Sequence, residues 1–386
     1  MAVIATETYR LRGQVREPDT QLGLAARYWR SASGFWRGPG AWKAQGLAGL
    51  VVCSVILQLS IQYRLNYWGR DFFDAFGRRD GATLQSQALL FLPLAGASLL
   101  ATVFAVWARM TTQRRWRAWL TGHLIDRWLL HERFRNLTFT VGEDQNPEYR
   151  IAEDARAATD APIALAVGLL NAVLSAIIFI GILWNVGGDL IVEGRGFTLT
   201  IPKYLVIAVA LYSALLTLAA MVIGRRLVSV IASKNAAEAQ FRSVGSHLQE
   251  RSAALPTAIG RPEQHHALAE ALGIVIASWR RVCFQLMRMT MVSQGNILLA
   301  PVLAWGLCAP KYLLGSMSLG EVAQVTAAFI TVQAALNWFV ENYAGLADCM
   351  SSVNRVASLL FAFDQLDSDD PVSAGALATP SDMAGK

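Results

Sequence analysis

Six apolar stretches, each long enough to cross a lipid bilayer, constrain this chain more than any other feature of its sequence. A helix rises about 1.5 Å per residue, so ~20 consecutive apolar residues span the hydrocarbon core. Stretches of this length predict an all-α membrane protein with six transmembrane helices. The predicted crossings are 46–67, 88–107, 162–184, 204–222, 297–314 and 322–346.

The overall composition supports the same class. Hydrophobic residues make up 54% of the 386 residues and charged residues only 16%, whereas soluble domains carry roughly 25% charged residues. The net charge of +6 does not indicate nucleic acid binding, because the basic residues are mostly arginines that cluster beside the apolar stretches. We therefore expect the lipid bilayer, and no nucleic acid, as a partner.

The distribution of cations predicts the orientation. The N-terminal segment up to and including Lys43 contains seven Lys and Arg residues. The long segments Arg109–Asp160 and Gly224–Met289 contain nine each, whereas the shorter loops between crossings contain few. Cytoplasmic loops of membrane proteins carry the excess of cations. We expect a multi-pass protein of the inner (cytoplasmic) membrane with both termini and both long segments in the cytoplasm.

The segments outside the crossings differ in character. We expect a disordered N-terminus over 1–25, a transmembrane domain over 26–366 and a disordered tail over 367–386. The mixture of aromatic rings and cations within 26–43 predicts a short helix at the membrane surface. Apolar residues at helical spacing predict that the helix of the second crossing continues into Arg109–Asp160, and we expect Gly187–Pro202 to be a glycine-rich outer loop.

The last crossing carries a polar stripe. At ~100° per residue, its polar side chains fall within a sector roughly 80° wide, and lipid penalises such a stripe strongly. The side chains therefore face protein or a water-filled pathway. Hydrogen bonding between packed helices and lining of a substrate pathway are both open for Gln333 and Asn337, while Glu341 leans toward a pathway. The stripe consists of Thr326, Gln333, Asn337, Glu341 and Asp348.

A second polar stripe follows the first crossing. Gln58, Gln62 and Asn66 recur every fourth residue and so share one helix face. This face would line the same substrate pathway if it met the stripe on the last crossing. Hydrogen bonding between helices is again the alternative.

No sequence motif for catalysis or for metal binding is present. The chain holds no G-x-x-x-x-G-K-[ST] phosphate loop, no H-E-x-x-H motif and no G-x-S-x-G elbow. Adjacent His265 and His266 would diverge on a helix, and the four cysteines have no paired spacing. We expect no catalytic residue, no metal site and no cofactor on this chain.

One short motif in the first long segment is distinctive. The sequence EDQNPEYRIAEDARAATDAP places Asn146 and Pro147 as a helix start. A capped helix with a salt link from Arg150 to Asp154 is the structural interpretation. The motif also resembles the Asn-Pro-Asp-Gln-Arg-Ile and Glu-Asp of the membrane domains of half-size ABC transporters, in the peroxisomal fatty-acyl group and the bacterial SbmA/BacA-like superfamily. The matching residues are Asn146, Pro147, Arg150, Ile151, Glu153 and Asp154, and the chain departs from the pattern at Glu148 and Tyr149.

Two further patterns extend the resemblance over roughly Tyr28 to Leu366. The stretch after the fourth crossing is similar in Gly224–Leu227, Glu238, Phe241 and Arg242. The last crossing is similar in Leu313, Gly315, Leu319, Gly320, Gln324, Ala328, Phe329, Val332, Leu336, Trp338, Asn342, Tyr343 and Arg355.

The resemblance implies an ABC exporter-type fold with long cytoplasmic extensions that works as a homodimer. Its extensions would contact an ATP-binding cassette, with Asn146, Pro147, Arg150, Glu153 and Asp154 in the coupling segment. In most such bacterial proteins the cassette follows on the same chain. Here we expect ATP to act through a partner cassette on a separate chain, although a lost cassette or a fragment of a longer transporter are also open.

Three functions remain open. The first is a transport subunit that moves peptides or amphipathic small molecules and has no ATPase activity without a cassette. The second is a cassette-independent, proton-coupled peptide importer of the SbmA/BacA type, with Glu341 as the proton carrier. The third is a membrane scaffold or regulator that transports nothing.

Overall fold

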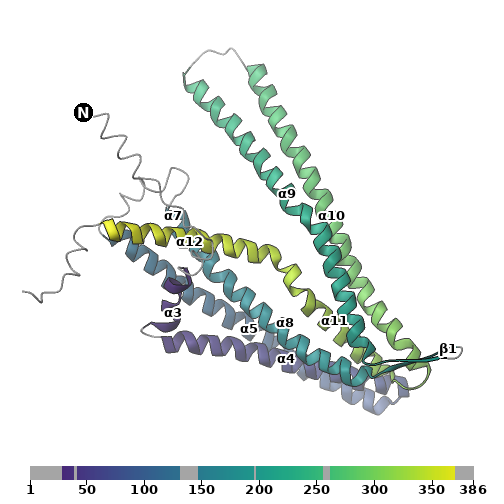
Figure 1. Ribbon diagram of the computed structural model, residues 1–386. Helices are drawn as coiled ribbons and strands as arrows, with labels where there is room; N and C mark the ends of the chain where they lie inside the picture. Colours follow the sequence, from purple (N-terminus) through teal and green to yellow (C-terminus); the bar gives the residue numbers. More distant parts are fainter. Residues whose placement is uncertain (1–27, 39–40, 131–146, 195–196, 255–260, 370–386) are drawn as a thin grey trace, which may run out of the picture. The chain divides into compact units, whose positions relative to one another are not determined.

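The computed structural model describes residues 28–38, 41–130, 147–194, 197–254 and 261–369 (Figure 1). Asn146, the predicted disordered N-terminus over 1–25 and most of the predicted tail lie outside the described residues. The last helix continues to Asp369, so residues 367–369 at the start of that tail are helical.

Helices make up nearly all of the described chain. Six helical stretches are long and apolar enough to cross a membrane, which confirms the all-α membrane fold with six candidate crossings. They are Ala41–Arg78, Gly81–Leu129, Pro147–Gly187, Tyr204–Leu248, Gln264–Leu313 and Leu319–Asp364. The elements are α3 (Gly34–Arg37), α4 (Ala41–Arg78), α5 (Gly81–Leu129), α7 (Pro147–Tyr149), the π-helical segment η2 (Arg150–Asp154), α8 (Ala155–Gly187), β1 (Leu190–Gly194), β2 (Phe197–Ile201), α9 (Tyr204–Ala254), α10 (Arg261–Leu313), α11 (Leu319–Glu341) and α12 (Tyr343–Asp369).

The helices extend well beyond the predicted crossings. As expected, α5 continues into the arginine-rich segment, where it ends at Leu129. Trp116, Leu120 and Leu124 are buried along one face of this part of the helix. The helices α9 and α10 lie side by side as a long antiparallel pair (Figure 1). Lys234 of α9 lies over the Trp279 ring of α10, with 4.3 Å between its Nζ and the ring centroid.

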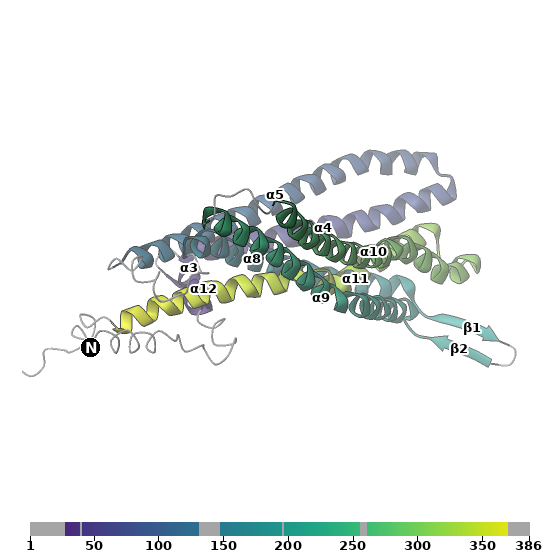
Figure 2. The same ribbon diagram turned by 90° about the horizontal axis from the view of Figure 1, so that it is seen from above.

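The segment predicted as a glycine-rich outer loop is instead a β-hairpin, which corrects that expectation (Figure 2). Strands β1 and β2 are antiparallel, in a register that pairs Leu190 with Ile201 and Gly194 with Phe197. The strands are rich in β-branched residues, which favour extended backbone. At the base of the hairpin, the Asp189 carboxylate accepts the Lys203 backbone N–H, with 3.1 Å between donor and acceptor. This hydrogen bond lowers the pKa of Asp189.

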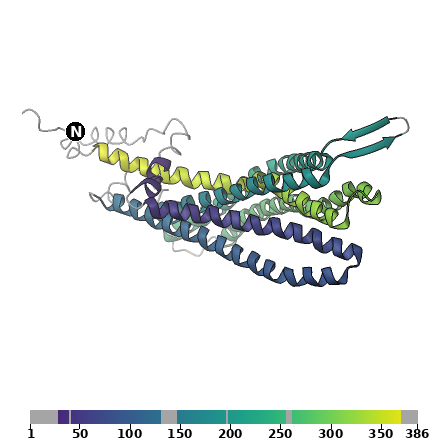
Figure 3. The same cartoon turned by 90° about the horizontal axis from the view of Figure 1, so that it is seen from below.

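The chain reverses direction between α4 and α5 in a tight turn (Figure 3). Arg79 adopts a left-handed backbone conformation with φ of 56°. Asp80 then caps α5, because one carboxylate oxygen accepts the Thr83 backbone N–H at 3.2 Å and the other accepts the Thr83 hydroxyl at 2.6 Å. These hydrogen bonds lower the pKa of Asp80, the side-chain bond from Thr83 contributing most.

The structure divides into two compact units. Among the described residues, the first unit contains those up to Leu65, those within 89–174 and those from 341 onward, and the second contains those within 66–88 and 175–340. In the first unit, a buried cluster joins the residues around Tyr28 to α5, α8 and α12. The Tyr28 hydroxyl donates to the Ala158 carbonyl. One face of the aromatic segment predicted at the membrane surface therefore packs against helices of the first unit.

In the second unit, the core gathers residues of α8, α9, α10 and α11, with Phe329, Leu183 and Leu205 at its centre. One crossing predicted as continuous is divided, since α11 ends at Glu341 and α12 begins at Tyr343. By contrast, α10 contains both Pro301 and Pro310 without interruption.

The N-terminus of α11 is held by a capping box and by α4. The Glu321 carboxylate accepts the Ser318 backbone N–H at 3.0 Å, and the Ser318 hydroxyl accepts the Glu321 N–H at 3.1 Å. From α4, Arg70 pairs with Glu321 at 3.0 Å between Nη2 and Oε1. The Asp74 carboxylate accepts the Gly320 backbone N–H at 2.8 Å. The N–H groups of Gly320 and Glu321 in the first turn of the helix are therefore satisfied.

Candidate functional site

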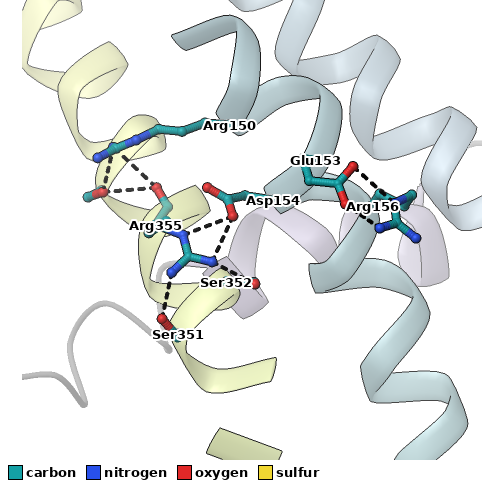
Figure 4. Close-up of polar contacts among 8 residues, drawn as sticks. Arg150, Glu153, Asp154, Arg156, Ser351, Ser352 and Arg355 are labelled. Carbon is teal, nitrogen blue, oxygen red and sulfur yellow. Dashed lines mark hydrogen bonds and ion pairs between the residues drawn. The ribbon is translucent and has the colours of Figure 1, made fainter. Parts of the chain in front are cut away.

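The segment predicted to couple to a cassette forms a short, partly buried element of the first unit (Figure 4). Pro147 begins α7, in the first helical position that proline favours. In η2, the side chains of Arg150, Ile151 and Asp154 are buried. A π-helical turn is rare and occurs often at functional sites, so this segment is a strong candidate site.

Two charged residues of η2 hold it against α12 (Figure 4). Arg355 donates to one oxygen of the Asp154 carboxylate from both Nε and Nη2, each at 2.8 Å. Arg150 donates to the Ser358 hydroxyl at 2.9 Å and to the Arg355 carbonyl at 3.4 Å. The ion pair described for Asp154 reaches Arg355 of α12, and the salt link expected from Arg150 to Asp154 within the segment stays a prediction.

The other face of the segment is open to solvent. Glu153 pairs with Arg156 three residues later, and both side chains are nearly half exposed. Tyr149 is 61% exposed and Glu148 is also exposed. Of the predicted coupling residues, Arg150 and Asp154 therefore anchor the element, and Glu153 lies where a second protein can reach it.

Arg355 was not among the predicted site residues, although it is the principal partner of Asp154. It also donates to the hydroxyls of Ser351 at 2.6 Å and Ser352 at 3.0 Å. A sequence signal existed, because Arg355 is the only cation in the segment 343–369. A single cation in an apolar helix is usually paired with an acid, but the sequence alone does not show which acid.

The polar stripe of the last crossing contacts α9 and α10 within the second unit. The Thr217 hydroxyl donates to the Asn337 amide oxygen at 3.0 Å. The Asn296 amide donates to the Gln333 oxygen at 3.3 Å and accepts the Tyr212 hydroxyl at 3.0 Å. Both stripe amides are buried and bridge helices in this subunit, as the packing alternative expects, and their place in a substrate pathway stays a prediction.

The remaining predicted pathway residues lie in different surroundings. Glu341 is exposed at the end of α11. On α4, Gln58 is half-buried and Gln62 is exposed. Asn66 is buried and donates to the Gln324 carbonyl at 3.1 Å, so its polar contact with α11 is to the backbone rather than to Gln333 or Asn337.

Several buried amide atoms of the second unit have no hydrogen-bond partner in the described part of the chain. They include both amide atoms of Gln324, the Gln333 nitrogen and the Asn66 oxygen. Gln324 is only 1% exposed. Buried polar groups are almost always paired, and intramembrane polar groups often mark solute pathways. The hydrogen-bonding capacity of these atoms is therefore unused within the described part of the chain.

Comparison with known proteins identifies the chain. Residues 39–313 match the family model described as ABC transporter transmembrane region 2. The chain belongs to this family. Among curated relatives of the ABC transporter membrane region, the inner membrane ABC transporter ATP-binding protein YddA of Escherichia coli is 27% identical over 92% of this chain and 63% of its own length.

Two further relatives are more distant. The chloroplastic ABC transporter D family member 2 of Arabidopsis thaliana is 22% identical over 89% of this chain and 46% of its own. An ABC transporter ATP-binding protein of Haemophilus influenzae is 22% identical over 79% of this chain and 50% of its own. The chain thus spans less than two thirds of the length of the curated relatives it matches. The match to the ABC transporter membrane region includes η2 and ends before Arg355.

Proposed function

We propose that the chain is the membrane-spanning part of an ABC-type transporter that moves peptides or amphipathic small molecules across the cytoplasmic membrane. The observation that carries the proposal is the match of residues 39–313 to the ABC transporter transmembrane region. Unpaired buried amides beside the helix-bridging residues of the second unit support a polar solute pathway. The pathway would include Gln58, Gln62, Asn66, Gln333 and Asn337.

In this proposal ATP hydrolysis is supplied by an ATP-binding cassette, on a separate chain or on a longer polypeptide. The cassette would dock on the exposed face of Pro147–Asp154 and on the paired extensions of α9 and α10. Two copies of the chain would form the transporter, with both termini and these extensions in the cytoplasm, as the cation distribution predicts.

A reconstitution experiment tests this function. The chain is co-expressed with a candidate cassette, inserted into proteoliposomes and assayed for ATP-dependent movement of fluorescent peptides. We expect transport and ATPase activity only with both parts, and neither when the catalytic residues of the cassette are disabled. A cassette that hydrolyses ATP at the same rate without the chain, and moves no solute with it, would contradict the proposal and favour a scaffold.

Glu341 supports a second function, proton-coupled peptide import of the SbmA/BacA type. Its carboxylate is exposed at the end of α11 and forms no ion pair with any residue the structure describes. A carboxylate without a cationic partner can bind and release a proton as the pH changes on either side of the membrane.

Replacement of this carboxylate separates the two functions. In proteoliposomes without cassette, Glu341→Gln should reduce uptake driven by an imposed pH gradient to the level of empty vesicles, because glutamine cannot carry a proton. The matched control is Asp348→Asn at an exposed acid of α12, which should retain uptake. Equal uptake by Glu341→Gln and the unmodified chain would rule out the proton-carrier role, while cassette-driven transport should change little in either variant.

A further inference from the structure

An apolar groove in the first unit is not used by the proposed transport function. It has a volume of about 230 Å³ and is lined by residues of four segments. Trp29 and Trp36 come from the aromatic N-terminal segment, and the other residues come from α4, α5 and α8. The predicted pathway residues are not among them. The buried lining positions include Val51, which is 7% exposed, and Ile163, which is 8% exposed; these two are called the deep positions below.

The polar side chain of Thr112 adds little polar surface to the lining. Thr112 lines the groove, but its hydroxyl donates to the Ala108 carbonyl of its own helix at 2.8 Å. The hydroxyl is therefore satisfied and leaves the methyl group as the apolar part of the side chain. Apart from the buried Trp116 indole nitrogen, which has no hydrogen-bond partner among the described residues, the groove offers a hydrocarbon ligand an almost entirely apolar contact surface.

The groove is large enough for part of an amphipathic ligand but not for a whole one. Sites for whole drug-sized ligands measure roughly 300–1,000 Å³, and this groove is smaller. A hydrocarbon tail fits better than a complete amphipathic solute. The polar headgroup of such a ligand stays outside the groove. Side chains near the mouth of the groove therefore decide which headgroup is preferred.

Two exposed cations come directly after lining residues in the sequence. Arg30 follows the lining residue Trp29 and Arg37 follows the lining residue Trp36, and both arginines are exposed. Neither forms an ion pair with a described residue. The stretch 28–48 contains no acidic residue. Aromatic rings and arginines together are typical of the headgroup layer.

The acid that comes nearest to the lining in the sequence is already engaged. Asp160 precedes the lining residue Pro162 by two positions, and its carboxylate lies 4.0 Å from Arg156. The Asp160 carbonyl accepts the Gln113 amide at 2.8 Å. Neither Arg30 nor Arg37 is therefore neutralised by this acid.

We propose that this groove binds an acyl chain of an anionic phospholipid from the surrounding bilayer, with Arg30 and Arg37 recognising its phosphate group. Arginine binds phosphate through paired N–H donors. The bilayer supplies the ligand at high local concentration, and the groove supplies the apolar surface that one chain needs. This lipid would fix the aromatic segment against α4, α5 and α8.

Photocrosslinking of the full chain tests the proposal. The protein is reconstituted in phosphatidylcholine vesicles containing a trace of phosphatidylglycerol with a diazirine in its acyl chain, or of phosphatidylcholine with the same chain. Adducts are mapped by mass spectrometry. We expect adducts at the deep positions Val51 and Ile163, several-fold more abundant with phosphatidylglycerol. Exposed Leu211 and Leu215 of α9 should react equally with both lipids.

Two kinds of variant complete the test. Ala166 lines the groove and is exposed, so Ala166→Phe should fill the groove and reduce the deep adducts to background while leaving those at Leu211. The matched control Ala118→Phe, at an exposed alanine of α5 outside the groove, should leave them unchanged. The double variant Arg30→Gln with Arg37→Gln should abolish the preference for phosphatidylglycerol.

Three results would overturn the proposal. Absence of deep adducts in the unmodified chain would mean that the groove is closed, for example by the protein's own residues 1–27. Deep adducts that persist in Ala166→Phe would place the lipid elsewhere. Equal yields from the two lipids in the unmodified chain would exclude recognition of an anionic headgroup.

Discussion

The variant Gly320→Ala should unfold at a clearly lower temperature than the unmodified chain. A methyl group at this position would lie 2.1 Å from the Arg70 carbonyl oxygen and 2.6 Å from the Asp74 carboxylate. The carbonyl belongs to the α4 backbone and cannot rotate away. The clash would also break the 2.8 Å hydrogen bond from the Gly320 N–H to Asp74. Overpacking of this kind costs ~1–3 kcal/mol or more.

Thermal unfolding of the purified protein in detergent, followed by tryptophan fluorescence, measures the effect. Gly306→Ala is the matched control, because a methyl group there meets no atom within 4 Å and alanine favours a helix over glycine by up to ~1 kcal/mol. The control should unfold at the same or a higher temperature. Equal unfolding temperatures for the two variants would contradict the close approach of α4 to the start of α11.

The variant Arg355→Met should destabilise the first unit by leaving a buried carboxylate without its cation. The Asp154 side chain is 3% exposed, whereas that of Arg355 is 45% exposed. Removal of one partner from a buried ion pair costs ~3–5 kcal/mol. The cost should fall toward the lower end here, because the cation itself reaches solvent. The other Asp154 oxygen already lacks a hydrogen-bond partner among the described residues, so it offers no hydrogen bond that would offset the loss.

A double-mutant cycle measures the pair directly. Asp154→Asn with Arg355→Met should regain much of the stability lost in Arg355→Met, because no buried carboxylate is left without Arg355. The control Arg156→Met removes the cation of the exposed pair with Glu153 and should cost less than about 1 kcal/mol. Equal losses from Arg355→Met and Arg156→Met would show that Asp154 is not held in a buried pair with α12.

The coupling segment shows where prediction from the sequence stopped. Asn-Pro spacing and the Arg-Ile-x-Glu-Asp pattern correctly placed a helical segment from Pro147 onward. They could not show that Arg150 and Asp154 turn toward α12, about two hundred residues later in the chain. A salt link within one helix needs only helical spacing, but a link between distant helices depends on how the chain packs.

The polar stripes show the same limit. The spacing of Gln333 and Asn337 predicted that both lie on one helix face, and both are buried against neighbouring helices. Their partners Thr217 and Asn296 lie on α9 and α10, and nothing in the sequence of those helices shows that they contact the stripe. The pairing of Arg70 on α4 with Glu321 at the start of α11 likewise depends on packing between helices and not on local spacing.

The sequence by itself determined the membrane class, the number of candidate crossings and the helical character of the chain. These properties follow from runs of apolar residues and from helical spacing, which are local and need no partner. The tertiary structure alone decided the hairpin of β1 and β2, the division at Asn342, the α12 partner of Asp154 and the groove beside Trp36. Each of these depends on which distant residues become neighbours, because hydrogen bonds, ion pairs and close packing form between surfaces that only folding brings together.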